Sequence, residues 1–252
     1  MRKYYQTEWH GIQFSDLSHS YSKVLAGPAF YQAFYQKFFE RYQNWGQLPP
    51  DWVSQKEHCA EFVLSRCADR AKILSVGCGL GAMEHYVRAR SPEVDLFIHE
   101  VAPAAWRWIA EEFEEEHKFL GLIPACLPDG IQFDLIYFCA VDYALDDEVL
   151  LGLLGAVRPF LATPAGRCLL ISASLQPAQK GIAAPLVSLL RRVKTLGAAV
   201  LEAAGLHTRG QFWGWMRTRR EYRSIMERAG YRDLQEGMIE PESSGLYWIS
   251  GR

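Results

Sequence analysis

The chain has 252 residues and a formal net charge of −2, from 27 basic and 29 acidic side chains. This length can bury a sizeable core, either in one α/β domain with an elaboration or in two small domains. The near-neutral charge excludes a global electrostatic preference for nucleic acid or for an anionic membrane surface.

Two further features concern compartment and metals. The N-terminus lacks the continuous apolar stretch of a signal peptide, and no run approaches the ~18 apolar residues of a membrane span. The six cysteines form no Cys-x-x-Cys pair, and neither they nor the seven histidines show a metal-ligand spacing. We therefore expect a cytoplasmic protein without a metal site.

The first 70 residues are predicted to form a helical extension, interrupted near residues 46–50. Phe30, Phe34 and Phe38 follow one another at i, i+4 and i+8, which places them on one stripe of a helix. A second helix is predicted from about Ser54 to Cys67. Core packing is the plainer interpretation of the many aromatic side chains here.

From residue 71 onward, short apolar runs alternate with helical patterns. The predicted strands are residues 72–76, 94–99, 133–138 and 167–172. One helix is predicted from about Ala82, and two more span about 103–117 and 146–161. Strands that alternate with helices at this spacing predict right-handed βαβ units and a parallel sheet.

The segment of residues 176–210 interrupts this alternation and is predicted to form one or two helices. Arg191, Arg192 and Lys194 lie beside leucines there, so the segment is either a substrate lid or, through residues 181–200, a peripheral membrane contact. A helix over residues 218–229 follows. The last predicted elements are two short strands, residues 231–234 and 245–250, which could form an antiparallel hairpin at a sheet edge.

A glycine-rich turn, Val76-Gly77-Cys78-Gly79-Leu80-Gly81, joins the first of these strands to a helix. Glycine allows positive φ and close approach of a ligand, and the helix N-terminus offers unpaired N–H groups. Glu100 ends the next strand, 19 positions beyond Gly81, where a carboxylate can accept both hydroxyl protons of a ribose. This pattern alone fits both S-adenosylmethionine and NAD, because Gly77-x-Gly79-x-x-Ala82 also matches the dinucleotide fingerprint.

The wider sequence resembles one family. Residues 73–81 resemble the first motif of class I S-adenosylmethionine-dependent methyltransferases, and Glu100 matches their second-strand acid. Residues 133–143 resemble their fourth strand with the loop after it, and residues 219–231 resemble their late helix and terminal hairpin. The resemblance covers roughly residues 60–252, less the insertion.

The resemblance implies a three-layer α/β Rossmann-like methyltransferase fold with a mostly parallel seven-stranded sheet and an antiparallel terminal hairpin. The helical N-terminal extension would span residues 1–70 and the methyltransferase domain residues 71–252, with a helical insertion at about 176–210 after the fifth strand. The implied cofactor is S-adenosylmethionine. Its implied contacts are Gly77, Cys78, Gly79, Gly81, Glu100, Val101, Cys126, Leu127 and Cys139.

Two positions depart from the family pattern. Ser75 stands where the family often has an acidic residue. Residues 123–128 offer no Asp for the adenine amine, so backbone groups and apolar packing around Cys126 and Leu127 are the expected adenine contacts.

The resemblance places Asp142 and Tyr143 beside the methyl group. Asp142 is a candidate base or substrate anchor, and the alternative is a helix cap. Tyr143 would pack against the sulfonium. The candidate acceptor contacts are Tyr21, which could cover the site together with Tyr31 or Tyr35, and Trp213, Trp215 and Arg217. An Arg suits a carboxylate or phosphate, whereas a Trp-rich strand that packs against the sheet is the alternative.

We therefore expect an enzyme that transfers a methyl group from S-adenosylmethionine to an O or N atom of a small molecule or saccharide. The alternatives are an NAD-dependent oxidoreductase and a non-catalytic module with the same fold. A nucleic-acid acceptor is not expected, because Cys139-Ala140-Val141-Asp142 stands where such enzymes carry an Asn/Asp-Pro-Pro-Tyr/Phe tetrapeptide.

Overall fold

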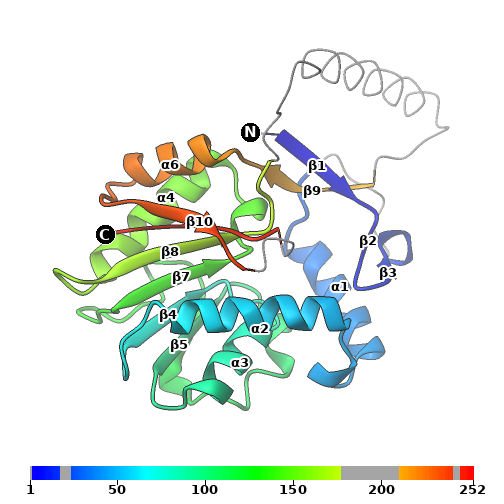
Figure 1. Cartoon of the computed structure of the whole chain (residues 1–252). Helices are drawn as coiled ribbons and strands as arrows, with labels where there is room; N and C mark the ends of the chain where they lie inside the picture. The colour runs from blue at the N-terminus through cyan, green and yellow to red at the C-terminus, as the bar shows by residue number, and fades with distance from the viewer. Residues whose placement is uncertain (1, 18–23, 177–209, 241–244) are drawn as a thin grey trace.

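The computed structural model describes residues 2–17, 24–176, 210–240 and 245–252. Its centre is a sheet of seven strands (Figure 1). These strands are β4 (Lys72–Val76), β5 (Asp95–Glu100), β6 (Lys118–Leu120), β7 (Leu135–Cys139), β8 (Arg167–Ser172), β10 (Gln235–Met238) and β11 (Tyr247–Gly251). Their spatial order is β10-β11-β8-β7-β4-β5-β6.

Five neighbouring strands, from β8 to β6, are parallel, and β11 runs antiparallel to both β8 and β10. The parallel strands are almost continuous apolar runs because both faces of the sheet are covered. The predicted parallel sheet and antiparallel hairpin are confirmed. The edge strand β6 was not predicted, since three residues are too few to show a periodic pattern.

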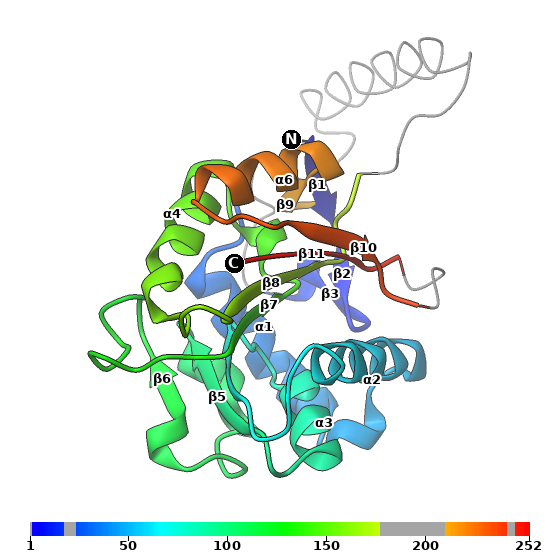
Figure 2. The ribbon, with the colours of Figure 1, turned by 60° about the vertical axis from the view of Figure 1, so that its left-hand side comes forward.

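Helices cover the two faces of the sheet (Figure 2). On one face lie α2 (Pro50–Leu64) and α3 (Ala82–Arg90), and on the other lie α4 (Asp147–Val157) and α6 (Arg219–Arg228). α4 begins at Asp146, whose side chain accepts a hydrogen bond from the Val149 N–H at 2.9 Å. α6 begins with a capping box between Thr218 and Glu221. These signals fix where each crossover helix starts.

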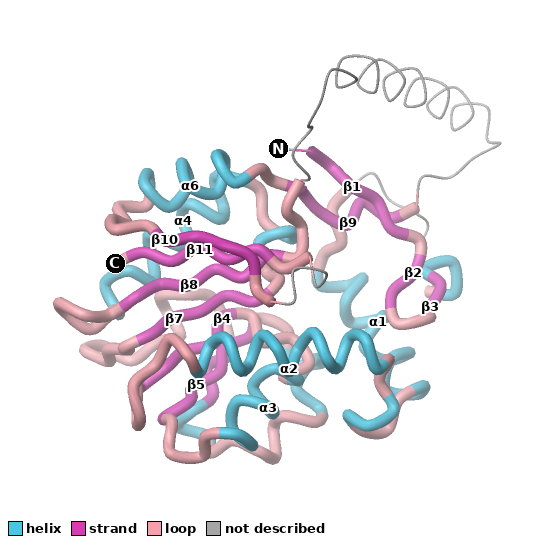
Figure 3. The backbone as a smooth tube through the Cα atoms, viewed as in Figure 1, coloured by secondary structure: helices cyan, strands magenta, loops and turns pink. Residues whose placement is uncertain are grey.

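The start of the chain differs from the prediction of a helical extension. β1 (Arg2–Gln6) pairs antiparallel with β9 (Gln211–Met216), apart from the main sheet (Figure 3). β2 (Glu8–Trp9) and β3 (Ile12–Gln13) form a hairpin, and α1 (Pro28–Arg41) follows. The helical prediction was wrong for these first strands because β1 depends on a partner strand far along the chain, which no local pattern reveals.

The segment of residues 103–117 was predicted as one helix and is not one. It contains two 3-10 turns, η3 (Pro103–Arg107) and η4 (Glu115–His117), separated by bends. Its apolar side chains divide between two cores: Trp108 packs near α1, whereas Ile109 and Phe113 face the sheet. Tertiary packing therefore overrides the local helical pattern.

Three predictions fall on residues outside the described ranges: Tyr21, the helices of 177–209 and the membrane contact through 181–200. Among the helices that the structure does describe, none has the length and apolar character needed to cross a bilayer.

Candidate cofactor and acceptor site

The glycine turn connects the carboxyl end of β4 to α3. Gly77, Gly79 and Gly81 have φ values of 70°, 57° and 75°, in the left-handed region that strains other residues. The N–H groups of Gly77 and Cys78 both donate to the His99 carbonyl, at 2.9 Å and 3.0 Å. The turn is thereby fixed against the end of β5.

Two of the glycines are also required by packing. A Cβ on Gly81 would lie 2.1 Å from Cδ1 of Ile109, and a Cβ on Gly77 would lie 2.8 Å from Cγ2 of Val141. Val141 belongs to the loop after β7, so this contact joins the turn to that loop. A larger residue at position 81 would push the turn away from Ile109, and one at position 77 would push it away from the loop after β7.

Gly79 faces more open space. The nearest atom to a Cβ on Gly79 would be the Tyr35 hydroxyl oxygen, at 3.7 Å. Tyr35 stacks on Tyr31, with ring centroids 6.3 Å apart. Of the tyrosines considered as covers for the site, Tyr35 on α1 therefore approaches the turn, and Tyr31 on α1 packs against Tyr35.

Glu100 is buried beside the turn and is held by backbone donors. Its Oε2 accepts the Gly79 N–H at 2.9 Å, and its Oε1 accepts the N–H groups of Val101 and Ala102 at 2.7 Å and 3.1 Å. A carboxylate has about four acceptor sites, of which three are used here, so one remains for a hydroxyl group of a ligand. Glu100 therefore fixes the turn in addition to being available to a ribose.

Sequence reasoning missed Glu84, a buried acid on α3. Its Oε1 accepts the Ser75 hydroxyl at 2.6 Å and the Tyr137 hydroxyl at 3.0 Å. Burial raises the pKa of the Glu84 carboxyl. A carboxyl group from α3 thus reaches Ser75, where the family often has an acid in the strand itself. The available signal was an acidic residue in the first turn of the helix that follows the glycine turn.

The predicted adenine contacts follow β6 at the same edge of the sheet. Leu127 is buried in the core, and Cys126 is partly buried, with its Cβ 3.6 Å from where a Cβ on Gly121 would lie. The Gly121 carbonyl lies 2.8 Å from Nε2 of His99, so His99 ties this loop to the end of β5.

Asp142 lies in η5 (Asp142–Ala144), the turn after β7, and is 1% exposed. Its Oδ2 accepts hydrogen bonds from the hydroxyls of Ser172 at 2.8 Å, Ser174 at 3.0 Å and Tyr222 at 2.5 Å. Burial raises the pKa of the Asp142 carboxyl. The side chain is directed toward β8 and α6, and Asp146 rather than Asp142 caps α4.

Arg217 has a different environment from the acceptor pocket predicted for it. It is fully buried, and its guanidinium donates to the Asp142 carbonyl at 2.7 Å, the Leu145 carbonyl at 2.5 Å and Oδ1 of Asp147 at 2.8 Å. These acceptors all belong to η5 and the start of α4. Arg217 therefore holds the loop after β7 in place, because a planar guanidinium can bind several acceptors at once.

Trp213 and Trp215 are buried on β9, which pairs with β1 and does not belong to the main sheet that the packing alternative named. Trp213 stacks on Phe14 and Tyr143, with ring centroids 5.1 Å and 5.9 Å away, and Trp215 packs against Phe212 at 5.0 Å. Between them, a Cβ on Gly214 would lie 2.2 Å from the Tyr143 carbonyl oxygen. β9 therefore packs directly against η5.

Four phenols meet between the N-terminal elements and η5. This tyrosine cluster consists of Tyr4, Tyr31, Tyr35 and Tyr143. The Tyr31 and Tyr35 rings stack at 6.3 Å, and the Tyr4 and Tyr143 rings are 6.4 Å apart. Burial raises the pKa of Tyr31 to about 12, and it raises the pKa of the other three phenols too. The cluster therefore presents neutral hydroxyls and aromatic faces.

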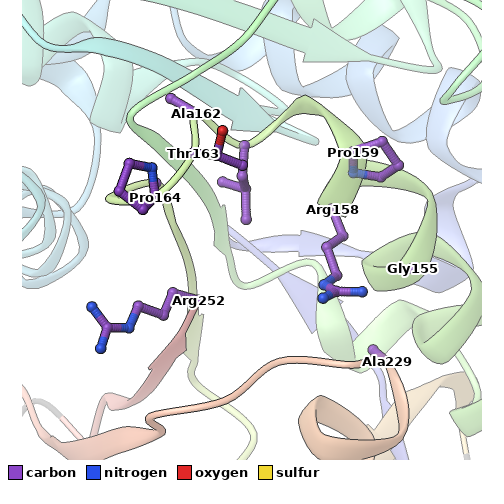
Figure 4. A pocket seen from close by; sticks show the side chains of 10 residues that line it. Gly155, Arg158, Pro159, Ala162, Thr163, Pro164, Ala229 and Arg252 are labelled. Carbon is purple, nitrogen blue, oxygen red and sulfur yellow. The ribbon is translucent and has the colours of Figure 1, made fainter.

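A depression of about 320 Å³ lies elsewhere, between the end of α4 and the start of β8 (Figure 4). Arg158, Thr163 and Arg252 are among the residues that line it. It opens at the amino end of β8, whereas the glycine turn follows the carboxyl end of β4, so it is not part of this site. In the described ranges, no group of three or more His, Cys, Asp or Glu side chains is arranged to hold a metal ion.

Comparison with known proteins gave matches among solved structures. No family model and no curated protein matches the chain. Human N-acetylserotonin methyltransferase, solved with S-adenosylmethionine, matches 90% of this chain with a TM-score of 0.55 and 18% identity. The mitomycin 7-O-methyltransferase MmcR matches 96% with a TM-score of 0.56 and 17% identity, and the pyocyanin biosynthetic protein PhzM matches 89% with 0.57 and 16%.

These matches cover 56%, 61% and 64% of the three longer chains, so this chain spans less than two thirds of each. The structural matches, and the strand order β10-β11-β8-β7-β4-β5-β6 of this chain, agree with the predicted architecture. That prediction rested on the glycine turn, Glu100 and the terminal hairpin. The chain has the fold of the class I S-adenosylmethionine-dependent methyltransferases.

Proposed function

We propose that this protein transfers a methyl group from S-adenosylmethionine to an oxygen atom of a small molecule. The observation that carries the proposal is the turn of three left-handed glycines, fixed beside the buried carboxylate of Glu100 at the carboxyl edge of the sheet. One structural neighbour is the mitomycin 7-O-methyltransferase, which supports oxygen as the acceptor atom. Transfer to a nitrogen atom, or to a saccharide, is the alternative choice of acceptor for the same enzyme.

The residues at the turn fit this cofactor. Glu100 would accept a ribose hydroxyl, and the backbone from Gly77 to Gly81, with Cys78, would lie along the amino-acid portion. Val101, Cys126 and Leu127 would border the adenine, and Cys139 would lie near the sulfur. When bound, the cofactor supplies a methyl group that its sulfonium already activates.

The strand order favours this cofactor over NAD. In a dinucleotide-binding sheet of the order 3-2-1-4-5-6, the strands are mostly parallel and continue outward from the fifth to the sixth. Here β11, the last strand of the chain, lies between β8 and β10 and runs antiparallel to both. The oxidoreductase alternative therefore has less support than methyl transfer.

The protein's part in the reaction is then alignment and exclusion of water. Asp142 and Arg217 would hold η5, because Oδ2 of Asp142 accepts three hydroxyl donors and the guanidinium binds acceptors of the same loop, although Oδ1 of Asp142 is buried without a hydrogen-bond partner among the described residues. Tyr143 would consequently be fixed in place, with its phenol toward Tyr31. In this proposal Asp142 acts by positioning, and Tyr143 contacts the reacting groups.

The N-terminal residues 1–70 would cover the cofactor. Tyr35 approaches Gly79, and α1 packs in the same aromatic core as Trp213, so this extension and the domain of residues 71–252 share the site. The role of a lid for the insertion at 176–210 stays a prediction.

A methyl-transfer assay tests the proposal. Protein and S-adenosylmethionine with a labelled methyl group are mixed with a panel of phenols, other hydroxylated small molecules, amines and sugars, and transfer of label is counted. Gly79→Arg should abolish transfer, because the new side chain would enter the space beside Tyr35. Gly130→Arg is the matched control: φ is +77°, no atom lies within 4 Å of its Cβ, and activity should persist. Transfer by Gly79→Arg equal to that of the control would contradict the proposal.

A further inference from the structure

A pair of thiols and a lysine meet behind the glycine turn, at the end of β7. Cys139 is the last residue of β7, and Lys56 and Cys59 lie one turn apart on α2. The Lys56 Nζ is 3.6 Å from Sγ of Cys139, and Cys59 and Cys139 pack in the same apolar cluster. All six cysteines of the chain are free thiols.

The environment makes Cys139 the most acidic of these thiols. The neighbouring Cys59 thiol and the Lys56 ammonium lower the pKa of Cys139 below its ordinary value, against the opposing effects of burial and of the Glu84 carboxyl. The pKa is raised for each of the other five cysteines, which are Cys59, Cys67, Cys78, Cys126 and Cys168. A thiolate is the reactive form of cysteine, so reactivity is concentrated at Cys139.

Exposure separates the roles of the two sulfurs. Cys139 is partly exposed, whereas Cys59 is fully buried behind it. A small oxidant therefore reaches Cys139 first, and Cys59 is the nearest thiol for the next step. This is the arrangement of an attacking and a resolving cysteine.

We propose that Cys139 and Cys59 form a peroxide-sensitive dithiol that closes to a disulfide and thereby weakens cofactor binding. In the first step the Cys139 thiolate attacks one oxygen of hydrogen peroxide, the O–O bond breaks, and the leaving hydroxide takes a proton to become water. In the second step the sulfur of Cys59 attacks the sulfenic acid of Cys139, and a second water leaves. Both thiols are oxidised and one peroxide is reduced to two waters.

The effect on the cofactor rests on the proposed function. Cys139 is followed by Ala140, which has a φ of 55°, and by Val141, which packs on Gly77. A covalent bond from Cys139 to α2 would move this loop against the glycine turn. The turn would then hold its ligand less well.

The experiment treats the reduced full-length protein with hydrogen peroxide near neutral pH and maps the peptides by mass spectrometry. We expect a cross-linked peptide that contains Cys59 and Cys139, with the loss of two hydrogen atoms, reversed by dithiothreitol. Lys56→Met should slow its formation severalfold, because loss of the ammonium raises the pKa of the Cys139 thiol and lowers the fraction present as thiolate. In Cys59→Ala, Cys139 should instead be trapped as a sulfenic acid by dimedone. Cys67→Ser is the matched control and should form the cross-link at the wild-type rate.

Calorimetric titration with S-adenosylhomocysteine then compares the reduced and the cross-linked protein. We expect an affinity at least about tenfold lower after cross-linking, restored by reduction. Oxidation of Cys67 or Cys126 before Cys139, or a disulfide with another partner, would overturn the assignment of the dithiol. Equal affinities of the two forms would overturn the effect on the cofactor. Because the peptide map needs no cofactor, the dithiol is tested even if the proposed function fails.

Discussion

Replacement of Glu100 by Gln tests how the glycine turn is held. The carboxylate accepts three backbone N–H groups, one through Oε2 and two through Oε1. An amide has a single acceptor oxygen, and its best orientation keeps the bonds to Val101 and Ala102. The Gly79 N–H then faces an NH2 group without an acceptor. An unsatisfied buried donor costs about 1–3 kcal/mol, so Glu100→Gln should lower the free energy of unfolding by about that amount.

The same substitution tests the ribose contact. If the carboxylate also binds a hydroxyl of the cofactor, loss of this charge-assisted hydrogen bond costs a further ~1.5–3 kcal/mol, and the affinity for S-adenosylhomocysteine falls roughly tenfold to a hundredfold. Urea unfolding measures the first effect and calorimetry the second. The control is Glu111→Gln, at an exposed position, where stability should change by less than about 0.5 kcal/mol. A Glu100→Gln protein with wild-type stability and affinity would refute the reasoning.

Three other perturbations concern the loops around the site and the N-terminal elements. A Lys at position 217 cannot bind the three acceptors of the Arg217 guanidinium, so Arg217→Lys should lower the free energy of unfolding, measured in urea, by about 3–5 kcal/mol. The control Arg220→Lys, on the surface, should leave it unchanged. An unchanged stability of Arg217→Lys would contradict the positioning role. Gly81→Ala should lower the free energy of unfolding, because Ala is strained at the left-handed φ and its Cβ contacts Ile109. In a double-mutant cycle, Ile109→Ala should recover part of that loss of stability. Strictly additive losses in the two variants would argue against the contact. Burial and Lys56 lower the pKa of His10 from 6.5 to about 4, so the unfolded chain takes up a proton first as the pH falls. The free energy of unfolding should therefore decrease by up to about 1.4 kcal/mol per pH unit between these two values, and His10→Gln should flatten that part of the profile measured by urea unfolding. An unchanged slope in the variant would assign the pH dependence to other groups.

Much of the fold could be predicted because its signals are local. The buried parallel strands are short apolar runs, and Gly77, Gly79 and Gly81 occupy the left-handed positions that their spacing indicated. Glu100 lies at the end of its strand, as predicted. The parallel strands, the glycine turn and the position of Glu100 could be predicted without information about distant partners.

The remaining features depend on contacts between distant segments. β1 forms only by pairing with β9, and the Arg217 guanidinium is defined by carbonyls in η5 that its own neighbours in sequence do not reveal. Glu84 replaces the acid missing at Ser75 from a different element. Contacts of this kind, between residues far apart in the chain, leave no periodic pattern in the sequence. The sequence therefore suggested a ligand contact for Arg217.

The identity of the cofactor is the central claim, and a calorimetric titration of the unmodified, reduced protein tests it most directly. S-adenosylhomocysteine and NAD are titrated separately into the same preparation, with Gly79→Arg and Gly130→Arg alongside. We predict saturable binding of S-adenosylhomocysteine by the wild type and by Gly130→Arg, none by Gly79→Arg, and no heat of binding with NAD. Saturable binding of NAD by the wild type, with no response to S-adenosylhomocysteine, would contradict the account.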